Sequence, residues 1–75
     1  MNNLRRKQIK EALSLIEEAY DLLTMAKDEE EMAFDNLPES LQYSERGDIM
    51  QDNITNLDDA ITGLDDAKSA LENIE

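Results

Sequence analysis

Residues 54–74 read ITNLDDA, ITGLDDA and KSALENI, a seven-residue unit repeated almost three times. Apolar residues occupy the first and fourth places of the unit, as in a helix that packs one stripe of side chains along another helix. Upstream, four alanines also recur at intervals of seven, beside a row of larger apolar residues. They are Ala12, Ala19, Ala26 and Ala33, beside Ile9, Ile16 and Leu23. The sequence therefore predicts an all-α fold of two long helices with heptad packing.

The first helix is expected at about residues 3–35. Asn2 or Asn3 can cap its start, and neither proline nor glycine interrupts the chain before Pro38. We expect this helix to form one arm of an antiparallel hairpin, in a single domain of residues 1–75.

A turn with a short helix is expected at residues 36–44. Pro38 disfavours helical geometry at the residue before it and suits the first turn of a new helix. The second long helix is then expected at about residues 45–73, with Ser44 as its N-cap.

The first helix has apolar residues on both flanks of its seam, more than one neighbouring helix can cover. They are Leu13, Tyr20 and Phe34 on one flank, and Leu15 and Leu22 on the other. We expect the seam to face the second helix and the remaining flank to face another protomer, with the alanines allowing close approach. Met25 and Met32 are expected to pack in the oligomer interface, with a partner surface as the alternative.

The second helix has one inner stripe of large apolar residues, with two alanines alongside. The stripe is Met50, Ile54, Leu57, Ile61, Leu64, Leu71 and Ile74, and the alanines are Ala60 and Ala67. Two charged residues, Glu30 and Lys68, occupy places in the heptads where a core residue is expected. Such residues commonly fix register and oligomer state. Either the helix pair splays open at Glu30, or Glu30 meets a cation such as Arg46 from the turn or Lys68 of another chain. Ligand binding is the alternative role of these charged places.

Self-association is expected because 75 residues provide too little core for a lone hairpin. The chain has no cysteine for a disulfide, and without histidine or cysteine a structural zinc site is not expected. The predicted state is a homodimer or higher homo-oligomer that forms a four-helix or larger bundle.

The net charge of −12 is unevenly placed. Residues 1–10 carry four cations and no acid, whereas the other 65 residues hold three cations against all 19 acids, a net charge of −16. This surface repels nucleic acid, so no direct nucleic-acid partner is expected. No apolar run approaches the roughly 18 residues of a membrane span, and no signal-peptide core is visible. We therefore expect a cytoplasmic protein with no membrane partner.

An enzyme is not expected, because histidine and cysteine are absent and no catalytic constellation is visible. No cofactor is expected either. The acid pairs Asp58/Asp59 and Asp65/Asp66 lack the alternating spacing of a calcium loop and are interpreted as a solvated helix face.

The turn at residues 36–47 is the least repetitive part of the chain and combines an aromatic ring, amides, hydroxyls and a guanidinium. Such groups can stack on a base and hold a phosphate. In an antiparallel assembly, basic residues near the start of one protomer could meet the turn of its neighbour and form a ligand site. The candidate residues are Arg5, Arg6, Lys10, Tyr43, Ser44 and Arg46. The alternative is an ordinary connection between two helices.

Residues 33–42, which read AFDNLPESLQ, together with SERG at 44–47 and the repeated LDDA segment, resemble a group of short acidic proteins. These are encoded by phages and mobile elements of Gram-positive bacteria. The resemblance implies a phage-related setting in a bacterial host cell, where small acidic oligomers often block host defences.

These observations predict a non-enzymatic, phage-type counter-defence factor that sequesters a small nucleotide-like immune signal between protomers. One alternative is an acidic nucleic-acid mimic that inhibits a host DNA- or RNA-binding protein, as some anti-CRISPR proteins do. Another is a purely structural oligomerisation module.

Overall fold

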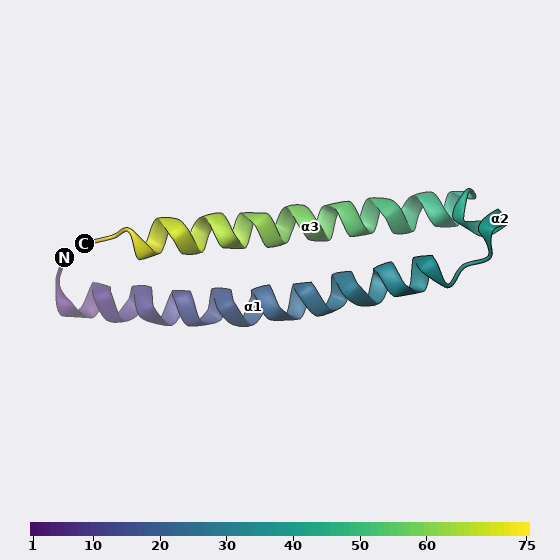
Figure 1. The fold of residues 1–75 in the computed structure, drawn as a ribbon. Coiled ribbons are helices and arrows are strands. Elements are labelled where there is room, and N and C mark those ends of the chain that lie inside the picture. The colour runs from purple at the N-terminus through teal and green to yellow at the C-terminus, as the bar shows by residue number, and fades with distance from the viewer.

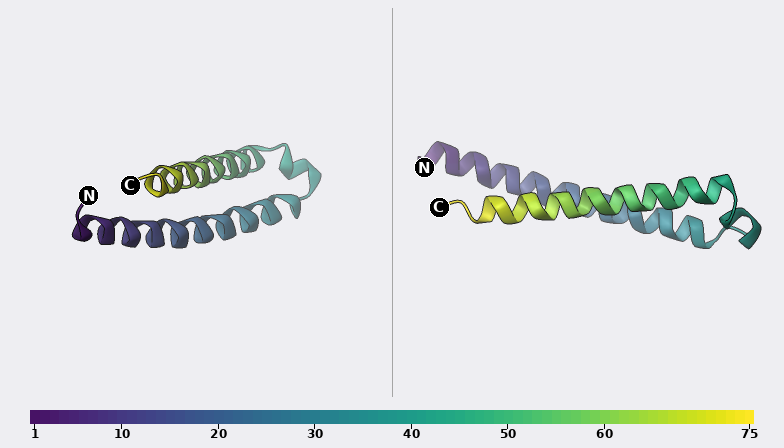
Figure 2. Two further views of the ribbon diagram at one scale, coloured as in Figure 1. Left: turned by 60° about the vertical axis from the view of Figure 1, so that its left-hand side comes forward. Right: turned by 90° about the horizontal axis from the view of Figure 1, so that it is seen from above.

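The computed structural model describes all residues 1–75 and contains three helices and no strand, with about 87% of residues helical (Figure 1). Helix α1 spans Asn3–Asp35, α2 spans Glu39–Gln42 and α3 spans Glu45–Glu72. The long helices α1 and α3 pack side by side in a rod of 58 × 15 × 13 Å. Both chain ends lie at one end of the rod and α2 lies at the other, as the further views of Figure 2 also show.

The helix ends follow from local hydrogen bonding. Asn2 caps α1, since its side-chain oxygen accepts a hydrogen bond of 2.8 Å from the Arg5 amide. The expected cap at Ser44 is only partly right. Ser44 stands at the N-cap position of α3, but its hydroxyl donates back to the Leu41 carbonyl and caps nothing in α3. α3 ends at Glu72, one residue before the expected end.

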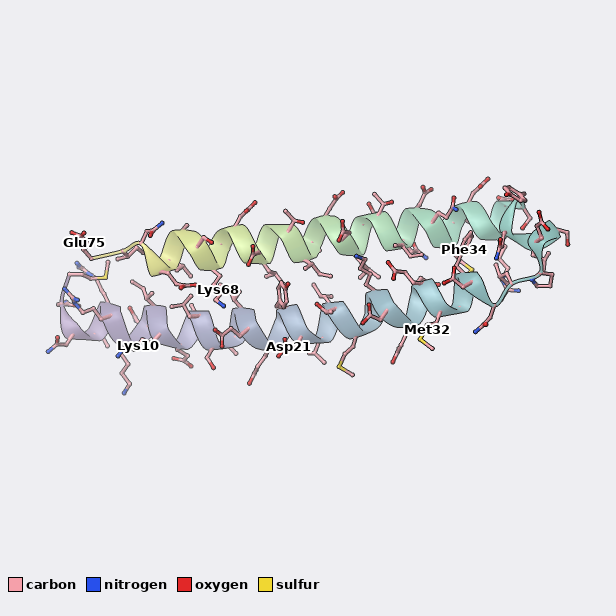
Figure 3. The ribbon with its side chains drawn as sticks, viewed as in Figure 1. Lys10, Asp21, Met32, Phe34, Lys68 and Glu75 are labelled. Carbon is pink, nitrogen blue, oxygen red and sulfur yellow. The ribbon has the colours of Figure 1, made fainter.

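The face of α1 that packs against α3 differs from the expected alanine line. Ala12 and Ala19 are half-buried, but Ala26 and Ala33 are exposed. Larger residues take the seam in the second half of α1: Lys27, Glu30 and Phe34, all half-buried. Figure 3 shows Phe34 directed towards α3, while Met32 and Asp21 point away from it. The close approach of backbones expected along the alanines is thus confined to the first half of α1.

The stripe of α3 that faces α1 is close to the expected one. Half-buried positions run along it at Ile54, Leu57, Ile61, Leu64, Ala67, Lys68 and Leu71. Only Gly47 and Met50, at the start of α3, are buried. Ile74 and Ala60 were expected to join the stripe but are exposed; Ile74 follows the end of the helix and is 43% exposed. A stripe that is half-buried almost throughout covers little apolar surface per helix.

The turn is held together at Gly47. A Cβ atom built at this position would meet the backbone of α2, with the Gln42 carbonyl carbon at 2.6 Å and the Leu41 carbonyl oxygen at 2.7 Å. The first turn of α3 therefore lies directly on the end of α2. Gly63, by contrast, has nothing within 4 Å of such a Cβ and stands on an open face of α3.

None of the helices combines the length and the apolar character that crossing a membrane requires.

Candidate functional site

The six predicted site residues fall into two groups at opposite ends of the 58 Å rod. Arg5, Arg6 and Lys10 belong to the first turns of α1, beside the chain ends, whereas the other three surround the start of α3. One protomer therefore does not bring the two groups together. A site that uses all six needs a second copy of the chain.

The first group borders a groove of about 500 Å³ between the start of α1 and the end of α3, here called the terminal groove. Its apolar lining is Ile9, Leu13, Leu71 and Ile74, and its polar lining is Asn3, Arg6, Lys7, Lys10, Glu72 and Glu75. Three cations thus stand against two acids. The terminal groove is a cationic patch on a chain whose net charge is −12.

Arg6 is the best-fixed cation of the terminal groove. Its Nε donates to the Met1 carbonyl at 3.2 Å, and one of its terminal nitrogens donates to the Glu75 carbonyl at 3.4 Å. The guanidinium therefore bridges both ends of the chain, and it has further N–H groups to offer. Arg5 is exposed and does not line the groove.

The second group lies at an end of the rod that has no groove of its own. Tyr43 is 81% exposed, and Arg46 is also exposed. The Ser44 hydroxyl is engaged with the Leu41 carbonyl. Gln42 ties this end together, because its side-chain amide donates to the carbonyls of Phe34 at 3.2 Å and Leu37 at 3.3 Å. The Tyr43 ring is thus largely open to solvent.

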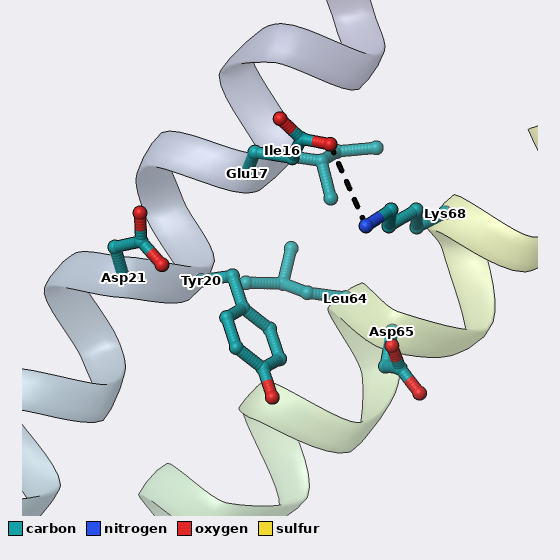
Figure 4. A pocket seen from close by; sticks show the side chains of 7 residues that line it. All are labelled: Ile16, Glu17, Tyr20, Asp21, Leu64, Asp65 and Lys68. Carbon is teal, nitrogen blue, oxygen red and sulfur yellow. Dashed lines mark ion pairs between the residues drawn. The ribbon is translucent and has the colours of Figure 1, made fainter.

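A second groove, of about 310 Å³, lies farther along the helix pair (Figure 4). Its lining residues are Ile16, Glu17, Tyr20, Asp21, Leu64, Asp65 and Lys68. The Lys68 ammonium lies 3.5 Å from Glu17 in the same chain. Two further carboxylates remain, so this groove repels anions and is a poorer place for a phosphate than the terminal groove.

The two charged residues of the seam have different surroundings. Lys68 pairs with Glu17 of its own chain, whereas Glu30 is half-buried and forms no ion pair with Arg46 or any other cation of its own chain. The interhelical ion pair of the second half of α1 is formed instead by Lys27, which bonds Asp58 at 3.0 Å. The sequence patterns did not single out that pair.

Sequence reasoning also missed Lys7 and the acids Glu72 and Glu75 in the terminal groove. A signal for Lys7 was present, because Asn3, Lys7 and Lys10 follow one another at intervals of four and three and so share one face of a helix. Glu72 and Glu75 could be assigned to the terminal groove only from the structure, which shows that α3 ends beside that face of α1.

No model of a protein family, no curated protein and no solved structure matches this chain. The resemblance to short acidic phage proteins therefore stays a prediction.

Proposed function

We propose that this chain is a non-enzymatic binding protein, an antiparallel helical hairpin that forms a homo-oligomer and sequesters a small nucleotide-like anion. In the phage-related setting that the sequence resemblance implies, the ligand would be a nucleotide signal of host immunity, and its capture would be a counter-defence activity.

The terminal groove is the observation that carries this proposal. Its volume of about 500 Å³ lies within the roughly 300–1,000 Å³ of small-molecule sites. It joins an apolar floor to three cations, the combination that a base or ribose attached to a phosphate requires. Over the rest of the surface the acids repel such a ligand, so the groove is where an anion concentrates.

Each side chain has a role in ligand binding that follows from its chemistry. The planar guanidinium of Arg6 suits a bidentate contact with phosphate, while Lys7 and Lys10 supply point charges. Arg5 extends the positive field outside the groove. Tyr43, with Ser44 and Arg46 beside it, would close the site from a neighbouring protomer and stack on the base.

Calorimetry with a panel of cyclic nucleotides and ADP-ribose derivatives tests the proposal. We expect one class of ligand to release heat, and Lys7→Gln and Lys10→Gln each to weaken its binding about tenfold, as expected for a lost charge-assisted hydrogen bond. Lys68→Gln also removes one positive charge, but at a position outside the terminal groove, and it should leave the affinity unchanged. Absence of heat with every ligand, or an equal loss in the Lys68 variant, would refute the proposal.

A second candidate function is an acidic decoy that occupies a basic nucleic-acid channel of a host protein. The exposed acids of α3 favour it, because rows of carboxylates can stand in for phosphates. Asp58 is unsuited to a test, since it bonds Lys27. Asp52, Asp59 and Asp66 are exposed and form no ion pair, so their joint replacement by asparagine should abolish salt-sensitive binding to a nuclease or repressor and spare nucleotide binding.

A further inference from the structure

The face of α1 turned away from α3 carries an apolar stripe that nothing in the protomer covers. Its members are Leu15, Leu22, Met25 and Met32, which are 58%, 66%, 58% and 63% exposed. Their spacings of seven, three and seven place them on one side of a helix. They occupy heptad positions a and d of a second helix–helix seam. We call these four residues the outer stripe.

The exposed area of the chain indicates that a partner covers such a face. The protomer exposes 5759 Å², whereas a compact monomer of 8.6 kDa exposes about 4,700 Å². The excess of about 1,000 Å² is close to the roughly 800 Å² per partner that a stable protein–protein interface buries.

The outer stripe is complementary to itself when two copies of α1 run in opposite directions. If residue i faces residue 47 − i of the partner, Leu15 lies opposite the partner's Met32, and Leu22 lies opposite the partner's Met25. Each pair joins a stiff leucine to an adaptable methionine. We propose that the outer stripe is the interface with a second copy of this chain, packed antiparallel about a two-fold axis between residues 23 and 24.

The charges of α1 select the antiparallel arrangement over the parallel one. Residues 5–10 carry four cations and no acid, whereas residues 28–35 carry five acids and no cation. In the antiparallel register, residues 28–35 lie opposite residues 12–19 of the partner, which carry two acids, and residues 5–10 extend beyond Asp35, the last residue of the partner's α1. Parallel packing in register would set residues 5–10 against the same four cations of the partner and residues 28–35 against the same five acids, and like charges that face each other oppose association.

One pair in this register opposes association. Glu18 would lie opposite the partner's Glu29, and the two-fold axis repeats the contact. Both side chains are exposed in the protomer. Both glutamates fall in the heptad rows of the outer stripe, so packing would remove water from them, and their repulsion would cost more than that of an exposed pair on one helix. This cost is specific to the proposed register and therefore gives a way to test it.

The same register brings the two groups of predicted site residues to one end of the dimer, a consequence that rests on the proposed function. Residue 12 would lie opposite Asp35, the last residue of the partner's α1, so Arg5, Arg6 and Lys10 would extend past it towards the partner's turn. The exposed Tyr43 of one copy would then lie at the same end of the dimer as the terminal groove of the other. The dimer would hold two equivalent sites, each with residues of both copies.

Disulfide trapping tests the register, since the chain has no cysteine of its own. Leu15→Cys and Met32→Cys proteins, mixed and oxidised, should give mainly the mixed disulfide. Residues 15 and 32 are about 25 Å apart along α1, far beyond the roughly 7 Å that a disulfide spans. Asn56→Cys, on an exposed position of α3, is the control and should cross-link poorly. Predominant Leu15→Cys homodimers would indicate parallel packing and overturn the proposal.

Sedimentation without nucleotide tests the interface. Leu22→Glu should weaken dimerisation at least tenfold, and Glu29→Gln should tighten it about threefold. If Leu22→Glu fails to fold, Glu29→Gln still tests the register. Unchanged or weaker dimerisation of Glu29→Gln refutes it. A wild-type protein that sediments as a folded 8.6 kDa monomer at micromolar concentration refutes the interface. A dimer that gives no heat with any nucleotide refutes only the ligand.

Discussion

The ammonium group of Lys27 lies 3.0 Å from a carboxylate oxygen of Asp58 and 3.7 Å from one of Glu31. The first contact joins α1 to α3 across their seam, and the second runs along α1. Lys27 is half-buried there, in the flank row of α1 that also holds Leu13, Tyr20 and Phe34. The hydrogen bond to Asp58 raises the pKa of Lys27 above its ordinary value of 10.5.

The raised pKa predicts a loss of stability in alkaline solution. The contribution of Lys27 is fully present below the pKa of an unfolded lysine, and it is lost as the pH rises through the higher folded pKa. Urea titrations at pH 9 and above should show a smaller fall in unfolding free energy for Lys27→Met than for the wild type. Lys7 is an exposed lysine without an ion pair, so the unfolding free energy of Lys7→Met should fall with rising pH as much as that of the wild type. Equal falls in all three proteins would contradict this account.

The two glycines should respond in opposite ways to alanine. Gly47→Ala drives a methyl group into the carbonyls of Leu41 and Gln42, and overpacking of this kind costs about 1–3 kcal/mol. Gly63→Ala meets nothing and should stabilise α3 by up to about 1 kcal/mol, because alanine favours helix. Thermal unfolding followed by circular dichroism measures both. If Gly47→Ala is as stable as the wild type, α2 does not lie on the start of α3.

Gln42 should contribute through the two carbonyls that it binds. Gln42→Ala removes one donor from the carbonyls of Phe34 and Leu37 in a partly buried place. The Phe34 carbonyl keeps its hydrogen bond from the Leu37 amide, so the loss should be about 1 kcal/mol. Gln51→Ala, at an exposed position of α3, is the matched control and should change stability by less than about 0.5 kcal/mol. Equal effects at both positions would show that the Gln42 amide faces water. Chemical denaturation gives both values.

Met50 is the buried apolar residue of the protomer, and its loss should be the most damaging truncation in α3. Met50→Ala should cost about 2–4 kcal/mol in unfolding free energy, from lost burial and the cavity left behind. The neighbouring Ile49 is 54% exposed, and Ile49→Ala should change stability by less than about 0.5 kcal/mol. Urea unfolding compares the two variants. A larger loss at Ile49 than at Met50 would mean that α3 is rotated about its axis.

The sequence by itself determined the helices and where they end. The heptads from Ile9 to Phe34 and from Met50 to Leu71 require long helices, Asn2 starts the first, and Pro38 stops its continuation. These signals are local, since a cap or a proline acts on residues within one turn of itself. The charge imbalance between residues 1–10 and the rest of the chain is likewise a property of the sequence alone.

Only the tertiary structure decided how the helices are rotated against each other. Heptad spacing shows which residues share a face, but a helix with apolar residues on several flanks can offer any of them to its neighbour. The packed pair exposes Ala26 and places Lys27 at the seam, where Asp58 can neutralise it. In the same way, the terminal groove exists because α3 ends beside the start of α1, and residues some 60 positions apart in the chain meet there only through the fold.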